Sequence, residues 1–96
     1  MRSPVPLSAK ERGFFEPRLA YDFSGVRIHT GAAADASARG LRARASTLGH
    51  HVVFARGKYA PETYEGQKLL AHELTHVIQQ GNGLVRGSSL LAAPRF

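Results

Sequence analysis

The sequence contains no cysteine, and this absence limits the kinds of site that the chain can build. Neither a disulfide framework nor a thiolate-bound metal can form without cysteine. A metal site would therefore have to use histidine and carboxylate ligands.

Long apolar stretches are missing as well. Residues 1–8 contain no apolar run of the length that a secretory signal needs, and no later stretch approaches the length of a membrane span. We therefore expect neither a signal peptide nor a membrane span, so any export must use another route.

Acidic residues are scarce relative to basic ones. Seven Asp and Glu against thirteen Lys and Arg give a formal net charge of +6. The basic residues are spread from Arg2 to Arg95 and do not alternate with aromatic residues as they would on a surface that binds nucleic-acid strands. We therefore expect no nucleic-acid partner.

Length and composition indicate one small folded domain. The chain has 96 residues, of which 43% are hydrophobic and 21% are charged. This composition is typical of globular proteins, and the length does not suffice for a second core. Because so small a core stabilises a fold only weakly, a bound metal would add to its stability.

The first predicted elements are an arm and a short helix. Residues 1–7 contain two prolines and are expected to form an irregular arm. The spacing of Ser8 and Glu11 is that of a capping box and predicts that a helix begins there. Pro17 should bend or end this helix. Its buried face is expected to consist of Phe14, Phe15 and Leu19.

A small sheet and a second helix are expected in the middle of the chain. The alternation of residues 26–29 predicts a strand on which His29 points away from the core. Residues 31–45 are rich in alanine and predict a helix, with the preceding threonine as its cap. Residues 47–54 contain a glycine at a tight turn and predict a hairpin. These segments make a sheet of about three strands.

The last predicted helix begins at Pro61, which suits a first helical position, and runs to about Gln80. The glycine-rich residues 81–83 mark its end. Residues 83–96 show no pattern and are expected to form a loose tail, so the domain should span residues 8–82. The predicted fold is therefore α+β, a single domain with three helices and a small sheet.

This last helix contains the pattern His-Glu-x-x-His. Residues four apart lie on one helix face, so the imidazoles of His72 and His76 can bind one ion. The carboxylate of Glu73 can reach a water molecule on that ion without being a ligand. Zinc lowers the pKa of such a water toward neutrality, and the glutamate can pass its proton to a leaving amine. The pattern therefore predicts a zinc site with Glu73 as the catalytic carboxylate.

The helix also separates an apolar face from a polar one. At 100° per residue, His72, His76 and Gln80 gather on one side, with Glu73 at the boundary. The other side collects Leu70, Leu74, Val77 and Ile78. This division would fix the helix by packing and leave the histidines facing a cleft.

A catalytic zinc ion normally takes three protein ligands, and the third is not evident. The sequence after His76 contains no His, Asp or Glu, and Glu65 lies two turns away, about 10 Å along the axis. We favour His29 or a histidine of the hairpin, because a strand or turn could pack beside the helix. Another chain or a missing segment of this one could also supply the ligand, or the two histidines could be surface residues that bind no metal. The upstream candidates are His29, His50, His51, Asp22 and Asp35.

Several motifs in a fixed order make the sequence recognisable. They are Phe-Glu-Pro-Arg (15–18), Asp-Phe-Ser-Gly-Val-Arg-Ile-His-Thr (22–30), His-Val-Val-Phe (51–54), Tyr-Ala-Pro (59–61) and Leu-Leu-Ala-His-Glu-Leu-Thr-His-Val-Ile-Gln-Gln (69–80). With them the sequence resembles the core domain associated with bacterial extracellular contractile injection systems (eCIS). This family has a proposed metallopeptidase activity, and the resemblance covers about residues 11–82.

The resemblance implies a zincin-like domain with Zn²⁺ as its cofactor and supports the roles of His72, Glu73 and His76. It implies a bacterial protein that acts as cargo, effector or accessory part of an injection device. Such a protein would start in the cytoplasm and leave it through the device. The implied function is hydrolysis of a peptide or protein substrate. We expect this substrate to lie along a sheet edge beside the helix, because an extended peptide adds readily to an unpaired strand. The alternative is a degenerate, non-catalytic docking or cargo module.

Overall fold

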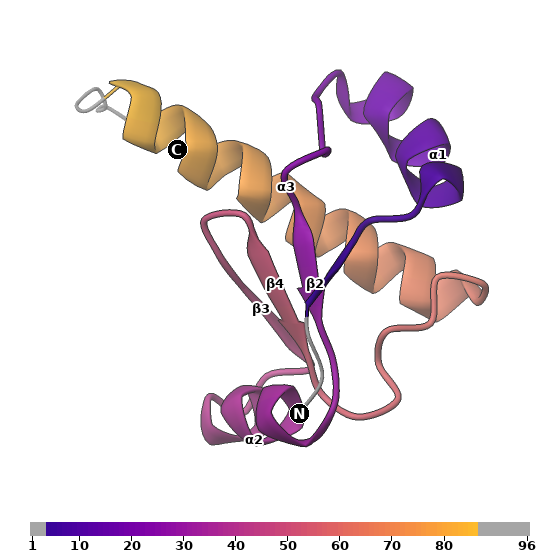
Figure 1. Ribbon diagram of the computed structural model, residues 1–96, viewed down its shortest axis with the longest axis vertical. Coiled ribbons are helices and arrows are strands. Elements are labelled where there is room, and N and C mark those ends of the chain that lie inside the picture. Colours follow the sequence, from indigo (N-terminus) through magenta and orange to yellow (C-terminus); the bar gives the residue numbers. More distant parts are fainter. Residues whose placement is uncertain (1–3, 87–96) are drawn as a thin grey trace.

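The domain combines a four-stranded sheet with three helices. The computed structural model describes the backbone of residues 4–86 and the side chains of residues 4–81. Helix α3 runs across the sheet, and α1 and α2 lie at opposite ends of it (Figure 1). This architecture confirms the predicted α+β class. The elements in order are β1 (Val5–Pro6), α1 (Ala9–Leu19), β2 (Arg27–His29), α2 (Ala32–Gly40), β3 (Ala45–Leu48), β4 (His51–Phe54) and α3 (Tyr64–Arg86).

The strands follow the order β1-β2-β4-β3, so β1 and β3 form the edges of the sheet. β2 and β4 are parallel, with Ile28 opposite Val52. β3 and β4 form the predicted antiparallel hairpin, with Thr47 opposite Val52. Gly49 occupies the hairpin turn with a φ of 61°, a left-handed conformation that glycine adopts without steric cost. The register places Ile28, Val52 and Thr47 on one face of the sheet.

One strand comes from the segment that was expected to be an irregular arm. Val5 and Pro6 pair antiparallel with β2, and the next residue, Leu7, is buried. Proline lacks an N–H group, which an edge strand tolerates because only one of its sides needs hydrogen-bond partners. The sheet therefore has four strands instead of about three.

Helix α3 covers the sheet face that carries Val52. Its apolar face is buried as the periodicity predicts, and burying one large aliphatic side chain contributes about 1.5–3 kcal/mol. Ile78 packs against this core and is partly buried. The largest fully buried side chains are Phe23, Phe54, Ile28, Leu70, Leu74, Val26, Val52 and Val77.

Helix α1 begins as the capping box predicts. Ser8 is the N-cap, and its hydroxyl oxygen accepts a hydrogen bond from the Glu11 N–H at 3.1 Å. Pro17 lies inside the last turn, and the chain leaves the helix at Ala20, which adopts a left-handed φ of 53°. The expected interruption by proline therefore coincides with the helix end.

The prediction for the buried face of α1 was wrong at one position. Phe15 is buried and Leu19 packs against the core, but the side chain of Phe14 is 39% exposed. The guanidinium of Arg18 stacks 3.8 Å from the centre of the Phe14 ring. This cation-π contact lets the ring remain at the surface.

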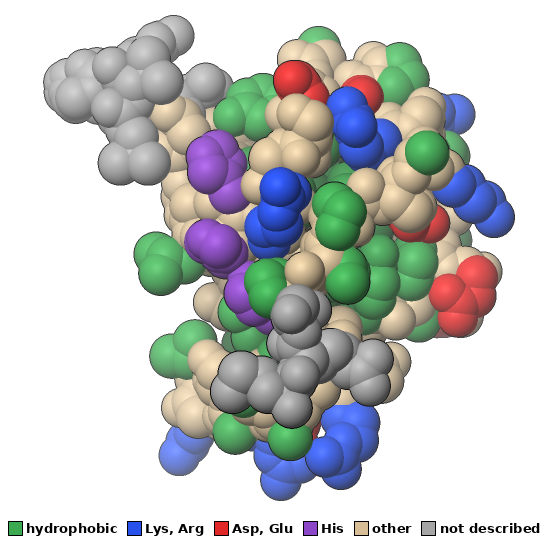
Figure 2. All heavy atoms as spheres, viewed as in Figure 1, with side chains coloured by type: hydrophobic (Ala, Val, Ile, Leu, Met, Phe, Trp, Pro, Cys, Tyr) green, Lys and Arg blue, Asp and Glu red, His purple; other side chains and the backbone are tan. Residues whose placement is uncertain are grey.

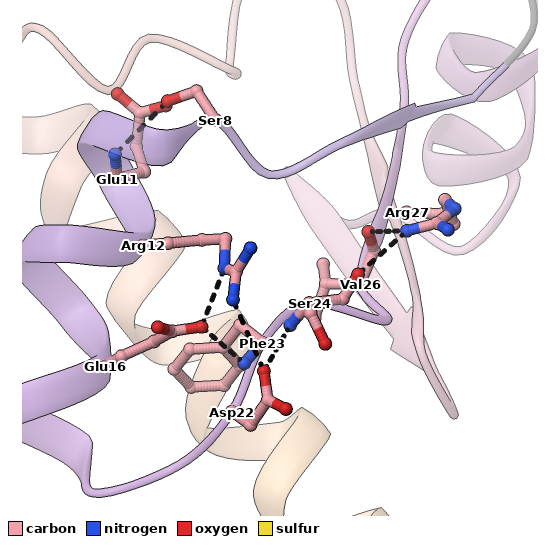
Figure 3. Close-up of polar contacts among 9 residues, drawn as sticks. All are labelled: Ser8, Glu11, Arg12, Glu16, Asp22, Phe23, Ser24, Val26 and Arg27. Carbon is pink, nitrogen blue, oxygen red and sulfur yellow. Dashed lines mark hydrogen bonds and ion pairs between the residues drawn. The ribbon is translucent and has the colours of Figure 1, made fainter.

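A polar network joins α1 to the turn before β2 (Figure 3). The Glu16 carboxylate accepts hydrogen bonds from Arg12 Nε and from the Phe23 N–H, both at 2.8 Å. Asp22 accepts a hydrogen bond from the Ser24 N–H at 2.9 Å and so stabilises the turn before β2. The bond from Arg12, followed by that from Phe23, lowers the pKa of Glu16 below its ordinary value.

Helix α2 is shorter than the alanine-rich composition predicts. It ends at Gly40, and the Ala43 N–H returns to the Ala38 carbonyl at 2.9 Å across a left-handed Arg42. This is a Schellman-type end, which reverses the chain so that β3 can begin at Ala45. The predicted threonine cap was also wrong, because Gly31 occupies the N-cap without a side-chain bond.

Helix α3 begins at Tyr64, three positions after the predicted Pro61. Thr63 supplies the cap, because its hydroxyl accepts a hydrogen bond from the Gly66 N–H at 2.9 Å. Gly66 is required there, since a Cβ at this position would lie 1.7 Å from the Ala60 carbonyl oxygen.

The predicted end of this helix at residues 81–83 was wrong, because α3 continues to Arg86. A Cβ at Gly81 would lie 2.6 Å from the hydroxyl oxygen of Tyr21. The glycine therefore permits close packing and does not end the helix. Residues 83–86 of the predicted tail are helical, and residues 87–96 lie outside the described part. No helix in the described part is both long and apolar enough to cross a membrane.

Candidate metal centre

Helix α3 presents the two predicted histidine ligands toward solvent and buries the glutamate. His72 is exposed and His76 is half-buried, whereas Glu73 is only 4% exposed. The neighbouring Leu70 and Leu74 are fully buried and anchor this stretch of helix against the sheet. The histidines therefore stand on a rigid element, which is what a preorganised site needs.

The two imidazoles converge on a common point. His72 Nε2 and His76 Nε2 lie 3.1 Å apart, and the rings are nearly perpendicular at 87°. Two nitrogens each about 2.0–2.1 Å from a zinc ion at a tetrahedral angle would be about 3.3 Å apart. The pair therefore fits two ligand positions of a zinc ion. Without a metal, the same separation suits an N–H···N hydrogen bond.

Gln79 orients one of these rings. His76 Nδ1 lies 3.1 Å from the Gln79 side-chain oxygen, one helical turn further on. An amide oxygen only accepts, so a hydrogen bond here requires the hydrogen on Nδ1, and a neutral imidazole then has its lone pair on Nε2, toward His72. This is the tautomer that a metal at Nε2 requires. Sequence analysis did not predict this role, which the spacing of three residues could have suggested.

Strand β3 holds the Glu73 carboxylate in place. The Thr47 hydroxyl donates to Glu73 Oε1 at 2.7 Å and lies 3.2 Å from the Glu73 carbonyl oxygen. The contact of Thr47 with Glu73 was not predicted from the sequence either. Alternation along β3 could have placed it on the helix side, but it does not reveal which helix residue it meets.

Gln80 adds a second connection between the same elements. Its side-chain nitrogen donates to the Thr47 carbonyl at 3.0 Å, and its oxygen accepts from the Gly49 N–H at 2.6 Å. Sequence analysis placed Gln80 on the polar face with the histidines. The structure shows that it fixes α3 against the edge strand and its turn.

The histidines of the sheet lie on its other face. Ile28 and Val52 are buried toward α3, so the adjacent His29 and His51 point the opposite way. They contact each other, with His29 Nε2 2.9 Å from His51 Nδ1. Burial lowers the pKa of His29, and the nearby His51 lowers it further. The structure therefore does not bring these two candidate ligands to the pair on α3.

The remaining candidates also lie elsewhere. His50 is exposed in the hairpin turn, and Asp22 belongs to the turn before β2. Asp35 is buried and accepts a hydrogen bond from the Arg56 N–H at 2.8 Å. Among residues 4–81, no group of three or more His, Asp or Glu side chains could hold a metal ion. The third ligand therefore stays a prediction.

The face of the sheet opposite α3 carries the contact between His29 and His51. Figure 2 shows histidine side chains on the left of the view, with a Lys or Arg side chain beside them. The contact between His29 and His51 belongs to strands β2 and β4. The molecule thus has two separate histidine pairs, one on the helix and one on the sheet.

The fold and the site define a small α+β domain whose His-Glu-x-x-His helix packs against the edge strand of a sheet. A comparison with family models matches residues 6–84 to the eCIS core domain, and the chain belongs to this family. Membership confirms the resemblance seen in the sequence and points to components of contractile injection systems as partners. No curated protein and no solved structure matches the chain.

Proposed function

We propose that this domain binds one zinc ion through His72 and His76 and hydrolyses peptide bonds of a protein handled by a contractile injection system. The observation that carries the proposal is the 3.1 Å separation of the two Nε2 atoms, on the helix that also carries Glu73. Family membership supports the association with contractile injection systems. The proposal adds that the protein is bacterial, is made in the cytoplasm and is exported through the apparatus.

Each residue of the site has a defined task in this proposal. A bound zinc ion would supply an activated water molecule as the nucleophile. His72 and His76 hold the ion, and Gln79 fixes the His76 tautomer. Glu73 takes the proton of the nucleophile and delivers it to the leaving amine, while Thr47 orients the carboxylate from the strand.

The edge position of β3 suits an extended substrate. Its backbone pairs with β4 on one side only, so the other side can accept a peptide as an additional strand. Leu48, on this strand, is 78% exposed and offers apolar contact. Because Thr47 joins β3 to Glu73, a peptide on this edge lies close to the catalytic residues.

Two ligands leave coordination positions open. No acidic residue or histidine follows His76 in residues 77–96, so a further protein ligand would come from upstream, from a segment outside this sequence or from another chain. Water and the substrate can fill the remaining positions, since a catalytic zinc needs at least one exchangeable site.

The test combines metal content with activity. We expect about one zinc per chain by elemental analysis, lost in the His72→Ala/His76→Ala variant and kept in the control Glu62→Ala, which removes an exposed carboxylate that is not a candidate ligand. Glu73→Gln should keep zinc and lose about 100-fold or more of the peptidase rate. The proposal is refuted by a folded wild type that takes up no zinc, or by a Glu73→Gln variant that cleaves peptides as fast as the native chain.

A non-catalytic docking module is the second candidate. It is favoured by the burial of Glu73 and by its bond to Thr47, because a carboxylate in this position also stabilises the fold. In that case zinc binding would raise the thermal stability of the chain, but no peptide would be cleaved. Association with purified injection-system components would then survive Glu73→Gln.

A further inference from the structure

A depression of about 280 Å³ lies directly beside the histidine pair. Four of its lining residues come from α3 at positions i, i+3, i+4 and i+7, so they share one helix face. The fifth, Arg44, immediately precedes the edge strand β3. The depression thus lies between α3 and the start of β3. Its lining residues are Arg44, Glu65, Lys68, Leu69 and His72.

The charges in this depression favour an anion. Arg44 and Lys68 face a single carboxylate, that of Glu65, and none of the three belongs to an ion pair among the described side chains. Lys68 Nζ instead lies 5.4 Å from the centre of the Tyr64 ring. Both cations are therefore available to an incoming ligand.

Among the described residues, three other cations contact carboxylates. Arg12 binds Glu16 at 2.8 Å, and both Arg39 and Arg56 lie 4.0 Å from Asp35. These contacts serve the structure of the domain. The cations of the depression make no such contact with a carboxylate, although Glu65 lines the same space.

Size and position define what can bind. Pockets for drug-sized ligands occupy about 300–1,000 Å³, so this smaller depression suits one side chain or one chain end. Lys68 precedes His72 by four residues, about 6 Å along the helix axis. An extended peptide covers that distance with about two residues.

We propose that Arg44 and Lys68 bind a peptide carboxylate one or two residues from the bond held at the histidine pair, so that the domain selects acidic substrates. The carboxylate belongs either to an Asp or Glu side chain or to the carboxyl terminus of the peptide. Leu69 contacts the methylene groups of the bound residue. The carboxylate of Glu65 repels the ligand and so limits the affinity for the peptide carboxylate. The placement of the scissile bond rests on the proposed peptidase function, whereas carboxylate binding does not.

The test measures binding and cleavage separately. The probes are fluorescently labelled octapeptides of alanine and serine in which one position at a time is replaced by Glu or by Gln. Each peptide is made once with an amidated and once with a free carboxyl terminus. Binding is measured by fluorescence anisotropy with the zinc-loaded Glu73→Gln chain, so that cleavage does not interfere. Cleavage is measured as kcat/KM with the native sequence.

Two variants of equal net charge separate the effect of the cations in the depression from the effect of net charge. Arg44→Gln/Lys68→Gln removes its cations, and the matched control Arg42→Gln/Lys58→Gln removes two exposed cations elsewhere. We expect a Glu peptide to bind about three- to tenfold more tightly than its Gln counterpart at low salt. The first variant should abolish this preference and the second should keep it. Glu65→Gln should increase the preference.

The outcomes separate the two proposals. A carboxylate preference that disappears in Arg44→Gln/Lys68→Gln, without any cleavage, supports this site and refutes the peptidase. Cleavage or binding without a carboxylate preference overturns this site, as does a preference that the matched control also loses. If only peptides with a free terminus show the preference, the site recognises chain ends; if internal Glu suffices, it recognises side chains.

Discussion

Replacing Thr47 with valine tests the connection between the edge strand and the glutamate. Valine has nearly the shape of threonine but cannot donate to Glu73 Oε1, which the hydroxyl now contacts at 2.7 Å. A hydrogen bond to a charged group contributes about 1.5–3 kcal/mol, and we expect about 1.5 kcal/mol because Thr47 is only half-buried. For a domain of this length the midpoint of thermal unfolding should fall by about 6–12 °C.

Urea unfolding of the variant chains measures this loss. Thr47→Ser keeps the hydroxyl and should recover most of the stability. Ser46→Ala is the control, because Ser46 faces the other side of the sheet and does not contact Glu73. A double-mutant cycle that combines Thr47→Val with Glu73→Gln measures the interaction energy between the two side chains, which we expect to be about 1 kcal/mol.

The reasoning is wrong if Thr47→Val costs no more stability than Ser46→Ala, or if the cycle gives no coupling. In the first case water replaces the hydroxyl at no cost. In the second, Thr47 stabilises the strand without acting on the Glu73 carboxylate.

Two further predictions concern the rest of the fold. Gly66→Ala should destabilise the chain by more than about 2 kcal/mol in urea unfolding, because its Cβ would overlap the Ala60 carbonyl, whereas Gly13→Ala meets open space and should be neutral or slightly stabilising. Stability should also fall as the pH drops below about 6.5, since the lowered pKa of His29 means that the unfolded chain binds a proton more readily than the folded one. Urea unfolding at pH 7.5 and pH 5.0 should show a smaller acid loss in His29→Gln; an equal loss would mean that other groups cause it.

Elements with a local signal were predictable from the sequence. The capping box at Ser8 and the glycine at the hairpin turn act within a few residues, and both predictions were confirmed. The apolar and polar faces of α3 also follow from helical geometry alone, which is why the convergence of His72 and His76 agrees with their spacing.

The features that could not be predicted depend on residues far apart in the chain. The short strand at Val5 exists because β2 offers it a partner, and Gly81 lies inside α3 where the Tyr21 hydroxyl leaves no room for a Cβ. By contrast, the alternation of residues 26–29 correctly predicts that His29 points away from the core, since the adjacent Ile28 is buried on the opposite face of the strand.

The bond from the Gly49 amide to Gln80 restricts where the chain can change in length. An insertion in the turn between Leu48 and His51 would move this amide away from Gln80 and release the end of the edge strand from the helix. An insertion at the exposed Gly57, in the connection between β4 and α3, would leave those contacts untouched. The turn should therefore keep its length among related domains, and the later connection is the place for an inserted tag, label or binding loop.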